Sequence, residues 1–266
     1  MKEKNVLQID SLVIDYSNKH FGLFRRNHTR AVNGISFSLH KGEILGVLGE
    51  SGSGKSSLLK AICRFIPIQK GRIFIDEIDV TSFSNKKFFP YRKKIQLIPQ
   101  DFCDIFNPKM TVKRILTEPL DVHFPYLTSR KKETRIIELL ESVELDRSLL
   151  ERFPSQLSGG QRQRLSIARG LAVEPELLMC DEIISASDLY TQKQILLLLQ
   201  NLNRKKNIAI LFVSHNIAVV SHLCHNIIVM RKGKVLDSGT PYEICKTPKS
   251  LYVQLLLDSV PKIKAI

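Results

Sequence analysis

Hydrophobic residues near the N-terminus either alternate with polar ones or run without interruption over a short stretch. Alternation over residues 7–17 and 35–39 predicts two strands with one buried face. The uninterrupted run Ile44–Leu48 predicts a fully buried strand. Glycines come next, and residues 56–62 have helix-forming composition, so we expect strand, glycine loop and helix in that order.

The second half of the chain changes to helical spacing and then alternates between strands and helices. Hydrophobic residues from Ile136 to Val143 recur at helical spacing, and another helix is predicted over residues 159–172. Further elements are expected as strands at 94–99, 177–180 and 208–213, a helix at 191–202 and a hairpin at 226–236. Strands that alternate with helices favour a mainly parallel sheet, so we predict an α/β protein with a helical insertion between residues ~110 and 175.

Composition narrows the class of protein. The 266 residues are 43% hydrophobic, and their longest hydrophobic runs are far shorter than the ~20 residues of a membrane span. The N-terminus is charged and leads into no secretory segment, so we expect a soluble, cytoplasmic chain. Five cysteines without a CxxC pair predict neither a disulfide framework nor a zinc site.

The formal net charge of +14 includes basic clusters at residues 25–26, 86–87, 92–94 and 130–132. Such an excess favours nucleic acid, anionic lipid headgroups or nucleotide polyphosphate as partners. A solvated basic surface explains it equally well. The charge alone therefore does not choose a partner.

Residues 49–56, GESGSGKS, fit the phosphate-binding pattern GxxxxGK[ST] between a predicted strand and a predicted helix. Glycines let the backbone wrap around phosphates with its N–H groups inward, and the helix N-terminus favours negative charge. Lys55 is expected to reach the β- and γ-phosphates, and Ser56 to bind Mg²⁺ through its hydroxyl. We expect the whole loop to contact the nucleotide: Gly49, Glu50, Ser51, Gly52, Ser53, Gly54, Lys55, Ser56 and Ser57.

Polar residues also end three other predicted strands, at the edge where α/β sheets bind ligands. Asp181 is suited to hold Mg²⁺ through water, and Glu182 to accept a proton from the water that attacks the γ-phosphate. His215 is suited to bridge the γ-phosphate and the catalytic carboxylate, and Gln100 to place an amide oxygen near the metal or the water. Each of these residues alone at a strand end is usually structural, and it is the phosphate loop upstream that favours catalysis.

The segment Leu157–Gln161, LSGGQ, begins a predicted helix. Ser158 and the N–H groups after it would cap that helix and form an anion site without side-chain bulk. This segment resembles the signature of the ATP-binding cassette (ABC) family, which also has a phosphate loop and an acidic strand end like Asp181 and Glu182 here. The resemblance extends from Leu7 to Val260. The resemblance implies a P-loop NTPase with a RecA-like mixed sheet core, an antiparallel β subdomain and an α-helical signature subdomain.

The resemblance also implies roles for the matching residues, with ATP and Mg²⁺ as cofactors. The catalytic residues would be Lys55, Gln100, Glu182 and His215, and the metal ligands Ser56, Gln100 and Asp181. In a head-to-tail dimer, the partner's nucleotide would contact Ser158, Gly159, Gly160 and Gln161, with Asp188 at the seam. Ser187 departs from the leucine that the family more often has there. Spacing does not fix the aromatic that stacks on adenine, and we prefer Phe24, with Phe21 and Tyr16 as alternatives.

Further segments are similar to the oligopeptide/dipeptide/nickel importer subfamily: Gly49–Gly52, Gln100–Asp101 with Phe106–Val112, Cys180–Ile183 and the C-terminal Leu251–Leu256. Cys245 stands alone where many first-type subunits carry a cysteine cluster, so the chain resembles a second-type ATPase subunit. We expect one ABC domain over residues 1–266, with a core at about 1–105 and 174–240, a helical subdomain at about 106–173 and a tail at about 241–266.

The resemblance implies an ATPase subunit on the cytoplasmic side of the plasma membrane. Its partners would be a second ABC ATPase subunit, two permease subunits and an extracytoplasmic solute-binding protein. The transported solute is not identified, because the cassette does not touch it. Two alternatives stay open: an ATPase for export or lipoprotein release, and, less favoured, a soluble ABC ATPase that acts on nucleic acid. The second is less favoured because such proteins usually carry tandem cassettes, zinc modules or long coiled-coil insertions, whereas only 56 residues separate Gln100 from Leu157 here, so we expect no nucleic-acid partner.

Overall fold

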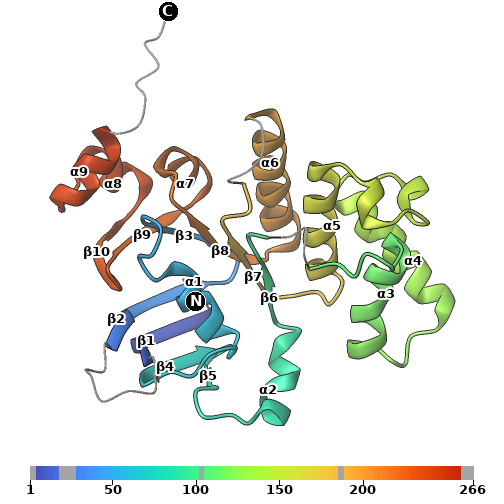
Figure 1. The fold of residues 1–266 in the computed structure, drawn as a ribbon, viewed down its shortest axis with the longest axis horizontal. Helices are drawn as coiled ribbons and strands as arrows, with labels where there is room; N and C mark the ends of the chain where they lie inside the picture. The colour runs from blue at the N-terminus through green and yellow to red at the C-terminus, as the bar shows by residue number, and fades with distance from the viewer. Residues whose placement is uncertain (1–3, 18–27, 102–104, 185–188, 259–266) are drawn as a thin grey trace, which may run out of the picture. The chain divides into compact units, whose positions relative to one another are not determined.

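The structure is a computed structural model that describes residues 4–17, 28–101, 105–184 and 189–258 (Figure 1). The chain folds as two compact units, Met1–Ser84 with Ala209–Ile266 and Asn85–Ile208. The first unit contains the phosphate loop, and the second contains the acidic strand end and the LSGGQ segment. The subdomains expected from the sequence, a core at about 1–105 and 174–240 and a helical subdomain at about 106–173, have other boundaries than these two units and stay a prediction.

The first unit contains an antiparallel sheet in the strand order β2-β1-β4-β5. Its hydrophobic alternation steps by three residues between Ile9 and Leu12, where Ser11 has a φ of 47° and the register with β2 shifts. This bulge keeps both hydrophobic side chains buried. The strands are β1 Asn5–Ser17, β2 His28–His40, β4 Lys70–Ile75 and β5 Ile78–Asp79.

The same unit contains a second set of strands, in which β3 lies between β8 and β9 and is parallel to both. Every residue of β3 and β8 is buried, which explains their uninterrupted hydrophobic runs. At Gly46 a Cβ would lie 2.4 Å from Val220 Cγ1, so glycine allows α7 to approach β3 closely. The strands are β3 Ile44–Leu48, β8 Ala209–Ser214, β9 Asn226–Arg231 and the antiparallel β10 Lys234–Gly239, and the helices are α1 Lys55–Ile62, α7 Ile217–Leu223, α8 Pro241–Lys246 and α9 Leu251–Asp258.

In the second unit, helices accompany two parallel strands, β6 and β7. The predicted hydrophobic positions of α4 are buried, and at Gly170 a Cβ would lie 2.8 Å from Ile98 Cδ1, so glycine lets α5 pack tightly on β6. The elements are α2 Asn85–Arg92, β6 Ile95–Ile98, α3 Val112–His123, α4 Ser129–Ser142, α5 Gly159–Leu171, β7 Leu177–Asp181 and α6 Leu189–Lys206, with 3-10 turns at Arg147–Leu149 and Pro154–Gln156.

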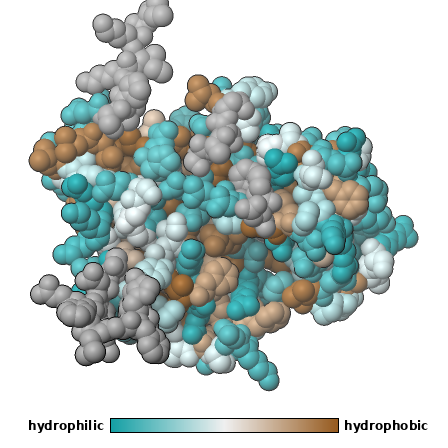
Figure 2. Space-filling view, in the orientation of Figure 1, coloured by the Kyte–Doolittle hydropathy of each residue, from teal (hydrophilic) through white to brown (hydrophobic). Residues whose placement is uncertain are grey.

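The last helix, α9, is buried on one side and exposes hydrophobic residues on the other. Tyr252 and Val253 are buried, whereas Leu251 and Leu255 are 70% and 59% exposed. Figure 2 shows hydrophobic residues gathered over this helix. Among the helices that the structure describes, none is both long and hydrophobic enough to cross a membrane.

Candidate functional site

The phosphate loop lies between the buried strand β3 and the helix α1, as predicted. Gly52 and Gly54 have φ values of 79° and 105°, a region that glycine adopts without the steric cost that a Cβ brings. At Gly54 a Cβ would lie 2.0 Å from the carbonyl oxygen of Ala31 in β2. Glycine at this position therefore allows the loop to pass directly over the backbone of β2.

Lys55 begins α1 and is almost completely buried, with 4% of the residue exposed. Its Nζ donates hydrogen bonds to the carbonyl oxygens of Gly49 at 2.8 Å and Glu50 at 2.9 Å. The ammonium group therefore lies inside the curve of the loop. The N-cap residue, Gly54, makes no side-chain cap, so no capping side chain would compete with an anion at the positive end of the helix dipole.

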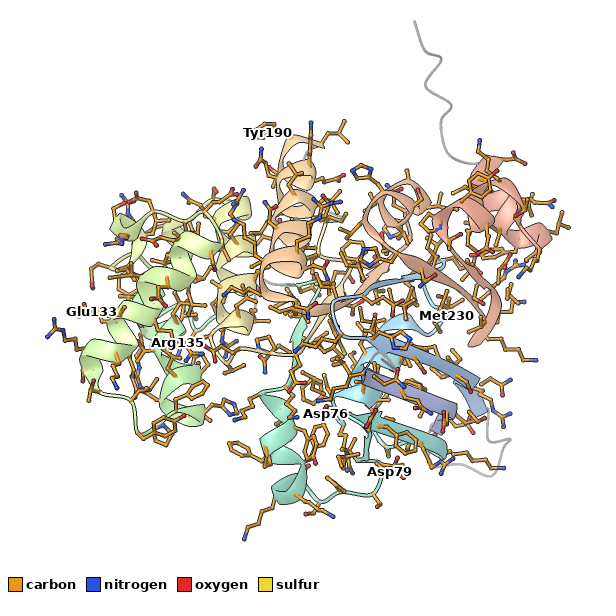
Figure 3. The ribbon with its side chains drawn as sticks, turned by 180° about the vertical axis from the view of Figure 1, so that it is seen from behind. Asp76, Asp79, Glu133, Arg135, Tyr190 and Met230 are labelled. Atoms are coloured by element: carbon orange, nitrogen blue, oxygen red, sulfur yellow. The ribbon has the colours of Figure 1, made fainter. Side chains whose placement is uncertain are left out.

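The strands beside β3 brace the loop and bring His215 to the same edge. Leu48 is in register with Ser214 of β8 and with Val229 of β9, so Gly49 and His215 directly follow β3 and β8, at the level of Met230 near the end of β9. Figure 3 labels Met230 at this end of β9. Its carbonyl oxygen would lie 2.4 Å from a Cβ at residue 49. The side of the loop next to β9 is thus closely packed.

One of the three candidate aromatics lies beside the phosphate-loop helix. The Tyr16 hydroxyl, on β1, hydrogen-bonds with Ser57 Oγ on α1 at 3.2 Å, and Tyr16 is 42% exposed. Phe24, the sequence preference, and Phe21 lie outside the described residues. Tyr16 is therefore the candidate whose surroundings the structure describes.

In the second unit, Gln100 and the two carboxylates lie at the ends of neighbouring strands, where Asp181 is the last residue of β7 and Glu182 follows it. Ile98 of β6 is in register with Cys180 of β7, which places Gln100 and Glu182 two residues past the same edge. Asp181 is 8% exposed, whereas Gln100 is exposed. Glu182 has a φ of 47°, a left-handed conformation that costs a non-glycine residue energy and that clusters at functional sites.

The LSGGQ segment caps α5 as predicted. The Ser158 hydroxyl accepts a hydrogen bond from the Gln161 N–H at 3.2 Å, and the Gln161 side chain accepts one from the Ser158 N–H at 2.9 Å. A Cβ at Gly159 would meet no heavy atom of the described chain within 4 Å. The chain's own packing in the described part therefore does not require glycine at residue 159.

Sequence reasoning missed Gln163, which connects α5 to the segment after β7 by a hydrogen bond. Its side chain is fully buried, and its amide donates a hydrogen bond to the Ile183 carbonyl, one residue past Glu182. The available signal was a glutamine at helical spacing from Ile167 and Gly170, on the buried face of α5. Asp188, predicted at a dimer seam, lies outside the described residues.

Known proteins are similar to this chain over most of its length. The family model described as ABC transporter matches residues 32–185. The chain is 38% identical over 91% of its length to the oligopeptide transport ATP-binding protein OppF of Streptococcus mutans, and it covers 79% of that protein. It is 40% identical over 98% of its length to the peptidoglycan transport ATP-binding protein YejF of Agrobacterium fabrum, of which it spans about half, 48%.

Solved structures show the same fold. The cbiO1 protein of Clostridium perfringens, part of an ABC transporter complex, superposes with a TM-score of 0.79 and 26% identity over 91% of each chain. A dimeric ATP-binding cassette, MJ0796 bound to ADP and Pi, gives a TM-score of 0.77 and 26% identity over 88% of this chain and 98% of that one. The α/β cassette fold predicted from the sequence is confirmed, and the chain belongs to the ABC transporter family.

Proposed function

We propose that this chain is the ATP-hydrolysing, nucleotide-binding subunit of an ABC importer for oligopeptides, dipeptides or a related small solute such as nickel. The observation that carries the proposal is the phosphate loop, with Lys55 buried inside its curve. The solute class rests on the oligopeptide transport proteins among the relatives.

The residues present fit ATP and Mg²⁺. Two loop glycines with positive φ and a helix N-terminus without a side-chain cap suit the phosphates, and Lys55 supplies a positive charge. Tyr16, which touches the phosphate-loop helix, suits adenine stacking. Mg²⁺ prefers oxygen ligands, which Ser56, Gln100 and Asp181 offer, and when bound it neutralises charge on the phosphates.

The chain's own residues would carry the hydrolysis. Lys55 would stabilise negative charge on the β- and γ-phosphates, and the loop N–H groups would fix their position. Glu182 would accept a proton from the attacking water, and the exposed His215 would hydrogen-bond near the γ-phosphate. The left-handed backbone of Glu182 supports its role as the proton acceptor, because a strained conformation persists only where the surrounding structure imposes it and such residues cluster at functional sites.

The second unit has a surface suited to a permease partner. A cavity of about 330 Å³ lies between β6, α3 and α5, and its lining includes Gln96, Val122, Ser166 and Arg169. Val122 is 52% exposed, and Phe89 of α2, which stacks on His123 at 5.2 Å between ring centroids, is 43% exposed. Hydrophobic and aromatic residues around a polar hollow are typical of a protein-docking site.

The remaining partners follow from the family. Residues 158–161, with open space at Gly159, would cover the nucleotide of a second ABC ATPase subunit. Two permease subunits and an extracytoplasmic solute-binding protein would complete the importer, with this chain peripheral on the cytoplasmic side of the plasma membrane. The dimeric cassettes among the solved structures support the pairing of two cassettes, and the head-to-tail arrangement is what the family resemblance implies.

The test is reconstitution of this chain with its partner ATPase and permeases in proteoliposomes. We expect MgATP-dependent uptake of a peptide or metal chelate delivered by the binding protein, and loss of that uptake in Lys55→Ala. Lys60→Ala, an exposed lysine in the last turn of α1, is the matched control. MgATP binding without uptake of any solute would contradict the transport proposal, and no MgATP binding would contradict the whole assignment.

A further inference from the structure

The C-terminal helix α9 reaches the phosphate loop through a single tyrosine. The Tyr252 hydroxyl accepts a hydrogen bond from the Glu50 N–H at 3.3 Å, across 202 positions of sequence. Tyr252 is 8% exposed, although Leu251 before it is 70% exposed. Burial raises the pKa of the Tyr252 hydroxyl, so the group that receives this hydrogen bond stays uncharged.

A second residue, Arg231 at the end of β9, joins this tyrosine to the loop. Its guanidinium lies 4.4 Å from the centre of the Tyr252 ring, and its Nε is 3.3 Å from Glu50 Oε1. Arg231 therefore contacts the tyrosine ring and the Glu50 side chain together. Both Arg231 and Glu50 are half exposed, so the ion pair by itself contributes little to stability.

The hydrogen bond from Glu50 to Tyr252 acts on the peptide unit that holds Lys55. The Glu50 N–H and the Gly49 carbonyl belong to the same planar peptide group. Tyr252 contacts the N–H end of this group, and the Lys55 ammonium contacts the carbonyl end at 2.8 Å. Fixing the N–H end therefore sets the direction of the carbonyl that orients Lys55.

We propose that Tyr252, supported by Arg231, is a positioning residue of the nucleotide site, through which the C-terminal helix sets the conformation of the phosphate loop. The inference rests on the proposed function, because it assumes that this loop binds ATP. Tyr252 would contact the backbone of the loop and not the phosphates. It pre-orders the Gly49–Glu50 peptide, so its loss raises the cost of ordering the loop around the nucleotide.

Tyr252→Phe in the full chain tests this, because it removes the hydroxyl and keeps the ring. One neutral hydrogen bond of this kind corresponds to a roughly three- to tenfold rise in the Kd and KM for MgATP, with kcat unchanged within about twofold. Tyr242→Phe, a 71% exposed tyrosine on α8, is the matched control and should bind MgATP like the wild type.

Arg231→Gln provides a second arm that leaves the buried ring in place, so it carries the test if Tyr252→Phe does not fold. We expect it to raise the Kd for MgATP as well, and the double variant to show less than the sum of both effects. Wild-type affinity in both single variants would overturn the inference while leaving the proposed function intact. A lower thermal midpoint with unchanged Kd would reduce Tyr252 to a structural role and also overturn it. A wild-type chain that binds no MgATP would overturn both.

Discussion

Gly54→Ala should destabilise the first unit by much more than the same change at Gly34. Both glycines have positive φ, 105° at Gly54 and 73° at Gly34, so each alanine pays the cost of a left-handed backbone. The two positions differ in their surroundings. A Cβ at Gly34 meets nothing within 4 Å among the described atoms, whereas at Gly54 it would lie 2.0 Å from the Ala31 carbonyl oxygen.

The expected difference follows from these contacts. A left-handed alanine costs about 1–2 kcal/mol, which is the whole expected effect at Gly34. At Gly54 the obstructing atom is main chain of β2, where Ala31 lies between Arg30 and Val32, which both pair with β1, so it cannot swing aside as a flexible side chain would. Forcing an extra carbon into a packed site adds about 1–3 kcal/mol, which brings Gly54→Ala to about 2–5 kcal/mol.

Urea unfolding followed by far-UV circular dichroism measures this difference, and the signal suits a chain without tryptophan. Gly159→Ala is a second control, because Gly159 has no positive φ and a Cβ there would meet open space among the described atoms. The free energy of unfolding of this variant should stay within about 0.5 kcal/mol of wild type. If Gly54→Ala and Gly34→Ala unfold at the same urea concentration, the close approach of the loop to β2 does not constrain the fold.

Two further variants address the chemistry. Glu182→Gln should keep MgATP binding but lower ATP turnover by at least about 100-fold, as measured by phosphate release, because the amide cannot accept the proton from water; unchanged turnover would exclude Glu182 as the base. Lys55→Ala should weaken MgATP binding by more than about tenfold in a titration, because a charge-assisted phosphate contact is lost, while Lys60→Ala binds normally; equal affinities would remove Lys55 from the site.

The features predicted correctly from the sequence are those that short segments determine. The five residues of β3 are all buried, and α1 begins at Lys55, as the hydrophobic run and the glycine loop indicate. Ser158 caps α5 because its hydroxyl needs only the N–H three residues later. Local hydrogen bonds and hydrophobic periodicity suffice for such elements, so one sequence reveals them.

The features that the sequence did not reveal depend on distant segments meeting. The contact of Tyr252 with Glu50 joins residues 202 positions apart, and no local pattern marks it. Gln163 bonds to Ile183 across 20 positions, because α5 and the end of β7 meet only in the folded unit. The contact of the Tyr16 hydroxyl with Ser57 is another such case, because spacing carries no information on which aromatic lies beside α1.

Two glycine motifs that look alike in the sequence are glycine-rich for different physical reasons. At Gly49 and Gly54, a Cβ would meet main-chain carbonyls of this chain at 2.4 and 2.0 Å, so glycine there is explained by the fold itself. At Gly159, a Cβ would meet no described atom within 4 Å, and the backbone needs no positive φ, so the fold gives no reason for glycine. A small residue on an open helix N-terminus is explained if another molecule comes close to it. This contrast supports the proposal that the phosphate loop serves the chain's own nucleotide and the LSGGQ segment that of a partner.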